Sequence, residues 1–150
     1  MIEKETVLPW DSPQFYRQAH AIGAQRVRFM EHRGRKILFV DFSKAELDVI
    51  RAVAAECLHV MMTQPPLSVL SLVEMEGIPF STEALKIGSE LTEKGQNYSL
   101  RTAVSPVVGF RSFLLQTVAD ASKRPIKLFK EREKALEWLV SEDGDAGTGR

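Results

Sequence analysis

Three carboxylate side chains follow predicted β-strands at positions where they could take part in chemistry. Asp41 ends a strand predicted over residues 36–41, and Glu74 and Glu76 lie at the end of a strand predicted over residues 68–75. Ligands of open α/β sheets bind beyond the carboxyl ends of parallel strands, and paired carboxylates there can transfer protons. No Ser/His/Asp set, phosphate-binding glycine loop or dinucleotide fingerprint accompanies them. We therefore favour roles in loop capping and solubility, and the sequence does not predict an enzyme.

A second candidate site lies at Gly109 and Arg111, where a predicted strand gives way to a helix. A helix N-terminus presents free backbone N–H groups and a partial positive charge, so an anion could bind there. The plainer interpretation is a tight turn that needs a glycine, and we favour it because a single glycine is a weak signal. Neither interpretation requires a cofactor, and the sequence predicts none.

The cysteine and the histidines offer no metal site by their spacing. Cys57 falls on an apolar helical stripe, which predicts a buried small side chain rather than a reactive thiol. His20, His32 and His59 form no pair with the i, i+4 spacing of metal ligands. A single cysteine also cannot form an internal disulfide, which is typical of proteins in a reducing cytoplasm.

Basic residues crowd the predicted N-terminal hairpin: Arg26, Arg28, Arg33, Arg35 and Lys36. They could contact anionic lipid head groups or an acidic partner. The alternative, which we favour, is a charged sheet edge that discourages aggregation. No aromatic platform for bases interleaves the cluster, so a nucleic-acid partner is not expected.

Length and composition define the broad class of protein. The chain has 150 residues, of which 44% are hydrophobic, and 20 Lys or Arg balance 20 Asp or Glu. This size is typical of one globular domain, and balanced charge argues against a dedicated nucleic-acid binder. No run of apolar residues approaches the length of a membrane span. The first residues lack the pattern of a secretory signal, and we expect a cytoplasmic protein.

Alternating strand and helix patterns position these side chains. A hairpin is predicted around a turn at residues 32–35, and its second strand contains the apolar run 37–40. The next helix is predicted to start at Ser43, with Glu46 completing a capping box. Further strands are predicted over 68–75, 100–108 and 126–129, and further helices over 82–95, 113–121 and 131–140. The order predicts an α/β fold: a mostly parallel mixed sheet of about five strands, one antiparallel strand from the hairpin, and helices on both faces.

The chain divides into three predicted segments. Residues 1–26 are expected to form an arm with one short helix, and residues 27–140 the α/β domain. Residues 141–150 lack large apolar side chains and are predicted to be disordered. Within the domain, Gly88 interrupts helix 82–95 at a cost of about 1 kcal/mol relative to alanine. We predict that a close approach of the helix to the sheet explains this glycine.

Four stretches of the chain resemble the SpoIIAA-like, STAS-related family. They are RFMEHRGRKILFVDFS, SVLSLVEMEGIPFS, NYSLRTAVSPVVGF and RPIKLFKEREKALEWL, and they cover roughly residues 27–140. Each stretch is degenerate, but their order and spacing together are fairly specific. The resemblance implies a fold similar to that of anti-sigma factor antagonists and, for some members, of the CRAL-TRIO lipid carriers. It implies a regulatory or ligand-binding module without enzymatic activity.

The chain departs from the pattern of the classical anti-sigma antagonists. Those proteins carry a phosphorylatable serine within Asp-Ser-x-Gly at the start of the helix after the central strand. The corresponding stretch here, residues 80–85, reads FSTEAL and lacks both the Asp and the Gly. Its hydroxyl side chains, Ser81 and Thr82, are the candidate phosphorylation sites. Where relatives often have Val-Gly-x-x-Gly, residues 108–112 read VGFRS and keep only the first glycine.

The resemblance leaves two functions open. The first is a non-catalytic regulatory module that contacts an unidentified protein partner, where a phosphate would add about two negative charges at a helix N-terminus. The second is a binder of a hydrophobic small molecule or lipid, with at most transient, peripheral membrane contact. An exposed edge strand also makes a homodimer a candidate assembly. The candidate ligand- or partner-binding residues are Glu74, Glu76, Ser81, Thr82, Gly109 and Arg111.

Overall fold

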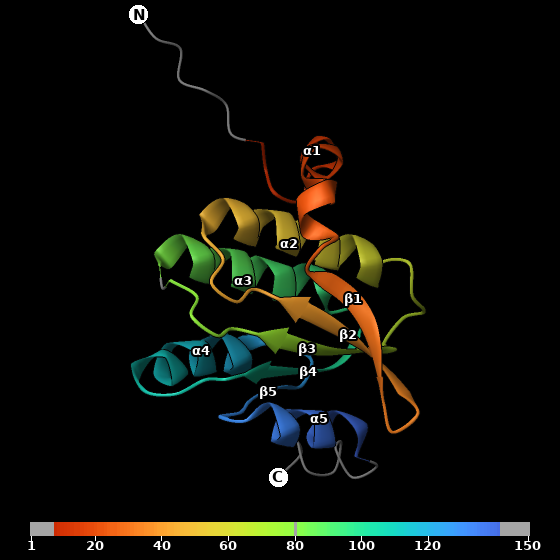
Figure 1. Ribbon diagram of the computed structural model, residues 1–150, viewed down its shortest axis with the longest axis vertical. Coiled ribbons are helices and arrows are strands. Elements are labelled where there is room, and N and C mark those ends of the chain that lie inside the picture. Colours follow the sequence, from red (N-terminus) through yellow and green to blue (C-terminus); the bar gives the residue numbers. More distant parts are fainter. Residues whose placement is uncertain (1–7, 80, 142–150) are drawn as a thin grey trace, which may run out of the picture.

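The structure is a computed structural model that describes residues 8–79 and 81–141. Of the segment expected to be disordered, residues 142–150 lie outside the described part. Within the described residues, the strands form one sheet in the order β1-β2-β3-β4-β5 (Figure 1). β1 and β2 pair antiparallel, and the other neighbouring pairs are parallel. The strands are β1 Val27–His32, β2 Arg35–Asp41, β3 Val69–Glu74, β4 Ser99–Ser105 and β5 Ile126–Leu128.

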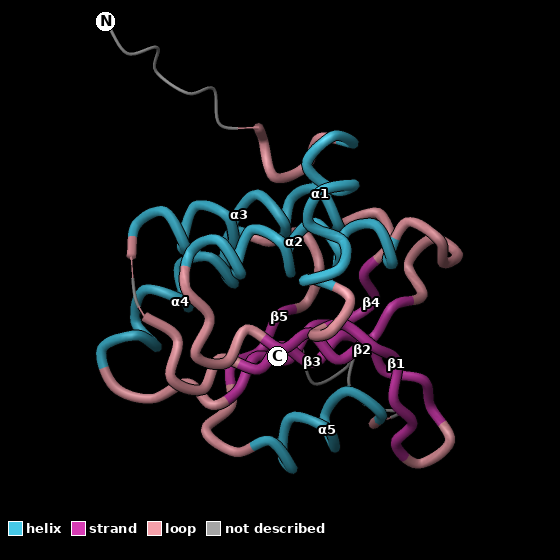
Figure 2. Tube along the Cα trace, turned by 45° about the horizontal axis from the view of Figure 1, so that its top comes forward, coloured by secondary structure: helices cyan, strands magenta, loops and turns pink. Residues whose placement is uncertain are grey.

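Helices connect the strands and cover the sheet on both sides. α2, α3 and α4 lie on one side, α1 packs on α2, and α5 lies on the opposite side (Figure 2). The predicted α/β class, with a mixed sheet and helices on both faces, is confirmed. The helices are α1 Pro13–Gly23, α2 Leu47–Met61, α3 Thr82–Gly95, α4 Phe110–Ala121 and α5 Arg132–Val140.

The strand β2 connects the two cores of the molecule. Its residues Ile37, Leu38, Phe39 and Val40 are all buried. Successive side chains of a strand point to opposite faces of the sheet. Leu38 and Val40 pack into the core under α2, whereas Ile37 and Phe39 pack into the core under α5. The continuous apolar run therefore belongs to a strand that is covered on both faces, as predicted.

The helix α5 is fixed to the sheet by burial and by an arginine. Ala135, Leu136 and Leu139 are buried in the core on this side of the sheet. From β4, the buried Arg101 donates from Nη1 to the carbonyls of Trp138 and Leu139 at 3.1 and 2.9 Å. These carbonyls lie at the end of α5, where the helix dipole favours a cation. The bonds tie the last helix to the centre of the sheet.

The segment that precedes the hairpin packs against α2 and α3. A Cβ added at Gly23 would lie 2.5 Å from the carbonyl oxygen of Ala52, so the two helices can approach this closely only at a glycine. Before α1, Trp10 is buried and donates from its indole Nε1 to Glu90 of α3 at 2.8 Å.

The predicted start of the helix after the hairpin is wrong. α2 begins at Leu47, and its N-cap residue Glu46 makes no side-chain capping bond. The backbone N–H of Ser43 instead donates to Asp41 Oδ1 at 2.8 Å, and Lys44 has a φ of 54°. The chain therefore makes a turn before the helix, and the capping box between Ser43 and Glu46 does not form.

The explanation predicted for Gly88 is also wrong. Nothing lies within 4 Å of a Cβ added at Gly88, so no close approach to the sheet requires a glycine there. Besides Gly23, a close approach occurs at Gly95, where an added Cβ would lie 3.2 Å from the Met61 side chain. Gly88 instead lines a cavity beneath α3.

Candidate ligand-binding site

The carboxyl ends of the parallel strands form one edge of the sheet, which we call the carboxyl edge. Asp41, Glu74 and Ser105 end β2, β3 and β4, and they lie opposite one another in register. α3 and α4 begin at this edge, because each follows a parallel strand (Figure 1). The sequence-predicted residues near this edge are Glu74, Glu76, Ser81, Thr82, Gly109 and Arg111.

Glu74 and Glu76 form a local pair at this edge. The Glu76 backbone N–H donates to Glu74 Oε2 at 3.2 Å. Partial burial raises the pKa of Glu74, the Asp41 and Glu76 carboxylates raise it further, and the Glu76 N–H and Arg132 oppose the shift. Ser105, the register partner of Glu74, is fully buried and offers no accessible nucleophile. This arrangement supports loop capping rather than acid–base chemistry.

The two candidate phosphorylation sites differ in what their hydroxyls do. Ser81 Oγ accepts a hydrogen bond from the Ala84 N–H at 3.0 Å and so caps α3. Such a cap satisfies an N–H group that the helix itself leaves unpaired. Ser81 is half-buried, whereas Thr82 is exposed at the first position of the helix. Thr82 is therefore the more accessible hydroxyl.

Gly109 has a conformational role at the start of α4. Its φ is 69°, in the left-handed region that favours glycine. This geometry supports the tight-turn interpretation. Arg111 lies half-buried in the first turn of the same helix. Gly109 and Arg111 thus share one helix N-terminus, while Ser81 and Thr82 share another.

A cavity that no sequence motif predicted lies between α3, α4 and strands β3–β5. Its volume is about 130 Å³. Its walls are mainly apolar, and no charged side chain of the described residues lines it. Representative lining residues are Leu91 of α3, Leu115 and Val118 of α4, Val73 of β3, Val104 of β4 and Leu128 of β5.

Small residues on α3 leave this space unfilled. Ala84 and Gly88 lie one turn apart on the face that lines the cavity. A Cβ added at Gly88 would meet nothing within 4 Å, and α3 packs against α2 and α4 rather than closely against the sheet. The i, i+4 spacing of Ala84 and Gly88 is the sequence signal that could have indicated the cavity, because such small side chains cannot fill a gap beneath a helix.

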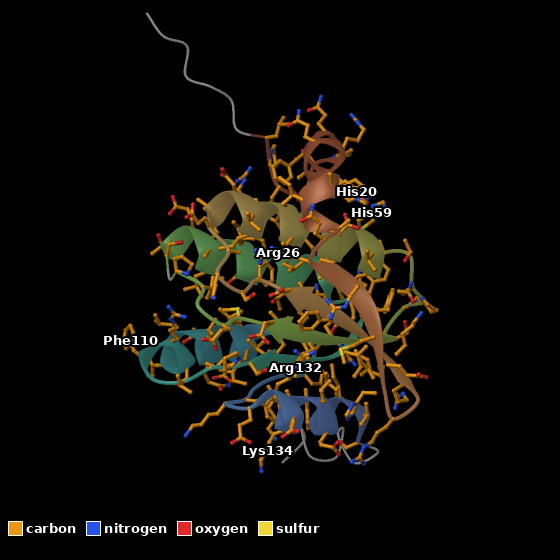
Figure 3. The ribbon with its side chains drawn as sticks, in the orientation of Figure 1. His20, Arg26, His59, Phe110, Arg132 and Lys134 are labelled. Atoms are coloured by element: carbon orange, nitrogen blue, oxygen red, sulfur yellow. The ribbon has the colours of Figure 1, made fainter. Side chains whose placement is uncertain are left out.

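Large apolar side chains are exposed on the helix that lines the cavity. Val108, just before α4, is 57% exposed, and Phe110 and Phe113 are 75% and 73% exposed. Phe110 projects from the start of α4 at the periphery of the molecule (Figure 3). Leu115 and Val118 of the same helix face the cavity. α4 therefore presents apolar side chains both to the cavity and to solvent.

The cysteine and the histidines occupy structural positions. Cys57 is buried in α2, and burial together with the nearby Glu56 raises the pKa of its thiol to about 12. Such a thiol is unreactive at neutral pH, which agrees with the predicted structural role. His20 Nδ1 lies 2.6 Å from Glu56 Oε1, and His59 stacks on Tyr16. In the described part of the chain, no group of three or more His, Cys, Asp or Glu side chains could hold a metal ion.

Basic residues of the hairpin are engaged within the molecule. Arg26 Nη1 donates to the carbonyls of Asp41 and Ser43 at 3.3 and 2.8 Å. The Arg28 guanidinium lies 4.7 Å from the centre of the Phe39 ring. These contacts support the interpretation as a charged sheet edge.

Among the described helices, none is both long enough and apolar enough to cross a membrane.

Comparison with known proteins identifies the fold. Models of protein families and the curated proteins give no match to the sequence. A solved structure does match: an uncharacterised protein of the DUF3478 family with a SpoIIAA-like fold, from Shewanella loihica PV-4. The TM-score is 0.57 over 76% of this chain and 92% of that chain, at 12% sequence identity. The predicted SpoIIAA-like fold is thereby confirmed, and at this identity the likeness establishes the fold alone.

Proposed function

We propose that the protein is a non-catalytic binding protein that holds a small hydrophobic molecule between α3, α4 and the sheet. The observation that carries this proposal is the apolar cavity of about 130 Å³. Two of the residues that line it, Thr92 and Thr102, have side chains with a hydroxyl group. Ligand sites are typically apolar with a few polar groups that fix the orientation of the ligand.

The volume of the cavity indicates the size of the ligand. A cavity of about 150 Å³ engineered into another protein binds benzene. The cavity of about 130 Å³ therefore suits one aromatic ring or a short alkyl chain. A whole phospholipid is much larger than this space, so the proposal narrows the lipid alternative to a small apolar molecule.

The cost of empty space also favours an occupant. Cavities destabilise proteins by about 24 cal/mol per Å³. A space of about 130 Å³ therefore costs at most about 3 kcal/mol, and less where it opens to solvent. Because total stabilities are about 5–15 kcal/mol, this is a substantial loss. A ligand that binds only the folded protein would offset it.

Calorimetric titration with hexanol, an uncharged probe with a short alkyl chain, tests this function. Gly88 lines the cavity at an exposed position, and a Cβ there meets nothing within 4 Å, so a leucine side chain has room to cover part of the cavity. We expect saturable binding by the wild type and binding about tenfold weaker or more by Gly88→Leu. Lys86→Leu, at an exposed position of α3, is the matched control and should bind like the wild type. No saturable binding by the wild type, or equal binding by all three proteins, would contradict the proposal.

A regulatory contact with a protein partner is the second candidate function. The exposure of Val108, Phe110 and Phe113 near the carboxyl edge favours it. Contiguous exposed apolar side chains mark interaction sites, and aromatic residues are enriched at protein interfaces. We propose that a partner would bind across the start of α4 and the start of α3. A phosphate on Thr82 would add negative charge to this contact surface.

Affinity capture from cell extract with matched variants tests the second function. The wild type should retain a stoichiometric partner that the double variant Phe110→Ser/Phe113→Ser loses. Phe29→Ser is the control, because Phe29 is a partly exposed phenylalanine on β1. Retention of the same proteins by the wild type and the double variant would contradict a partner site on α4. Binding to liposomes that only the double variant loses would assign these phenyl groups to a membrane surface instead.

A further inference from the structure

A second cavity adjoins the first and brings a charged side chain to one end of the site. Its volume is about 70 Å³. Its lining includes Ser122 and Arg124, beside the start of β4. The combined space is thus lined mainly by apolar side chains, and Ser122 and Arg124 add a hydroxyl and a charged group toward the edge of the sheet opposite the carboxyl edge. The residues that line both cavities are Val73, Leu91, Thr92, Thr102 and Ile126.

Arg124 is a half-buried cation without an acidic partner in the described chain. Its Nε donates to the Ser99 carbonyl at 3.0 Å, and its Nη2 donates to the Leu100 carbonyl at 3.4 Å. These bonds hold the guanidinium in place but do not neutralise its charge. Within residues 8–79 and 81–141, the ion pairs do not include Arg124, and its Nη1 donates no hydrogen bond.

Among the described residues that line the second cavity, Arg124 alone carries a charge. A further hollow, of about 280 Å³, lies between the C-terminal parts of α3 and α4, and Ser122 lines both it and the second cavity. Lys123 and Glu93 line this hollow from its two sides. Because their charges are opposite, this pair adds no net charge beside the hollow.

We propose that the ligand is a small amphipathic carboxylate, with an apolar tail in the first cavity and its carboxylate on Arg124; this rests on the proposed function of the cavity. Arginine binds carboxylates through charge-assisted hydrogen bonds, and it is already held in position here. From Ser99 to Val104, β4 rises about 16 Å beneath the combined space. A medium-length chain in extended form suits this distance.

Calorimetric titration with decanoate and decanol tests this assignment, because the two probes share a similar tail and differ in charge. We expect the wild type to bind decanoate about tenfold more tightly or better, as a hydrogen bond to a charged group implies. Arg124→Gln should remove this preference and leave decanol binding within about twofold of the wild type. Arg124→Lys, which keeps the charge, should retain much of the preference.

The controls separate this assignment from the function on which it rests. Arg35→Gln changes an exposed arginine of the hairpin and should bind both probes like the wild type. Equal affinity of the wild type for decanoate and decanol would overturn the carboxylate assignment and leave the proposed function intact. If neither of these probes nor hexanol binds the wild type, both are overturned. A preference that survives in Arg124→Gln, or that is lost equally in Arg124→Lys, would show that the charge of Arg124 does not select the ligand.

Discussion

Single side chains at the carboxyl edge act mainly on the turns that follow the strands. Asp41 accepts the backbone N–H of Ser43, and Glu74 accepts that of Glu76. Ser81 in the same way accepts a backbone N–H in the first turn of α3. These acceptors are engaged with local backbone groups, and they position two loops and the start of a helix.

The raised pKa of Glu74 predicts a pH-dependent effect of Glu74→Gln. A carboxyl whose pKa is raised mainly by burial binds its proton more tightly in the folded than in the unfolded state. The ionised form therefore costs stability above the folded pKa, and this cost disappears as the pH falls below the ordinary range of glutamate. Glutamine keeps an acceptor for the Glu76 N–H and removes the charge. We expect Glu74→Gln to raise the melting temperature at pH 7 and to match the wild type near pH 4.

Thermal unfolding followed by circular dichroism at several pH values measures this effect. Glu83→Gln, on the exposed face of α3, is the matched control. The effect assigned to Glu74 is the difference between the two variants at the same pH. A lower melting temperature of Glu74→Gln at pH 7 would contradict the prediction, since it would mean that the charge of Glu74 stabilises the fold.

Cys57 and Arg124 show which properties of residues can be predicted from the sequence. Apolar residues at helical spacing around Cys57 predict its burial, and it is buried. Arg124 stands in no periodic pattern. Its position depends on the carbonyls of Ser99 and Leu100, which precede it by 25 and 24 residues. Such a contact forms only when two strands come together in the folded chain, so no local spacing indicates it.

At the scale of elements, α5 is the helix whose packing is easiest to test. Leu139 is fully buried under the sheet. Replacement of such a leucine by alanine costs about 2–5 kcal/mol. For a chain of this size each kcal/mol lowers the melting temperature by about 2–4 °C. We therefore expect Leu139→Ala to lower the melting temperature by about 5 °C or more in a differential scanning calorimeter.

The matched control for this prediction is Lys134→Ala, because Lys134 is exposed on the same helix (Figure 3). It should melt within about 2 °C of the wild type, as most surface substitutions do. If Leu139→Ala melts as the control does, α5 does not pack on the sheet as the structure shows.

The boundaries of the elements could be predicted where local signals agree with the fold. α3 spans residues 82–95 as predicted, with a serine cap at one end and Lys94 and Gly95 at the other. α2 starts later than predicted, because Asp41 binds the N–H of Ser43 and a turn intervenes. The capping-box pattern cannot reveal this competing acceptor, which lies two residues before the serine.

At the scale of the whole molecule, the sheet could be predicted, whereas the size and boundaries of the cavity could not, even though two small residues of α3 indicate a gap. Alternating strands and helices predict parallel neighbours joined by helical crossovers, and β2, β3 and β4 are adjacent in that way. The cavity depends on how far α3 and α4 stand from the sheet, which is set by packing among helices distant in the sequence. A glycine within a helix predicts a close approach, whereas Gly88 lies beside open space.

Methyl proton–carbon correlation spectra recorded during titration with hexanol test most directly whether the cavity is a binding site. The account predicts saturable shifts of the methyl groups of Ile87, Val104 and Val118, which line the cavity. The methyl groups of Leu72 and Leu139, in the core under α5, should keep their positions. An absence of saturable shifts, or shifts confined to methyl groups outside the cavity, would contradict the account.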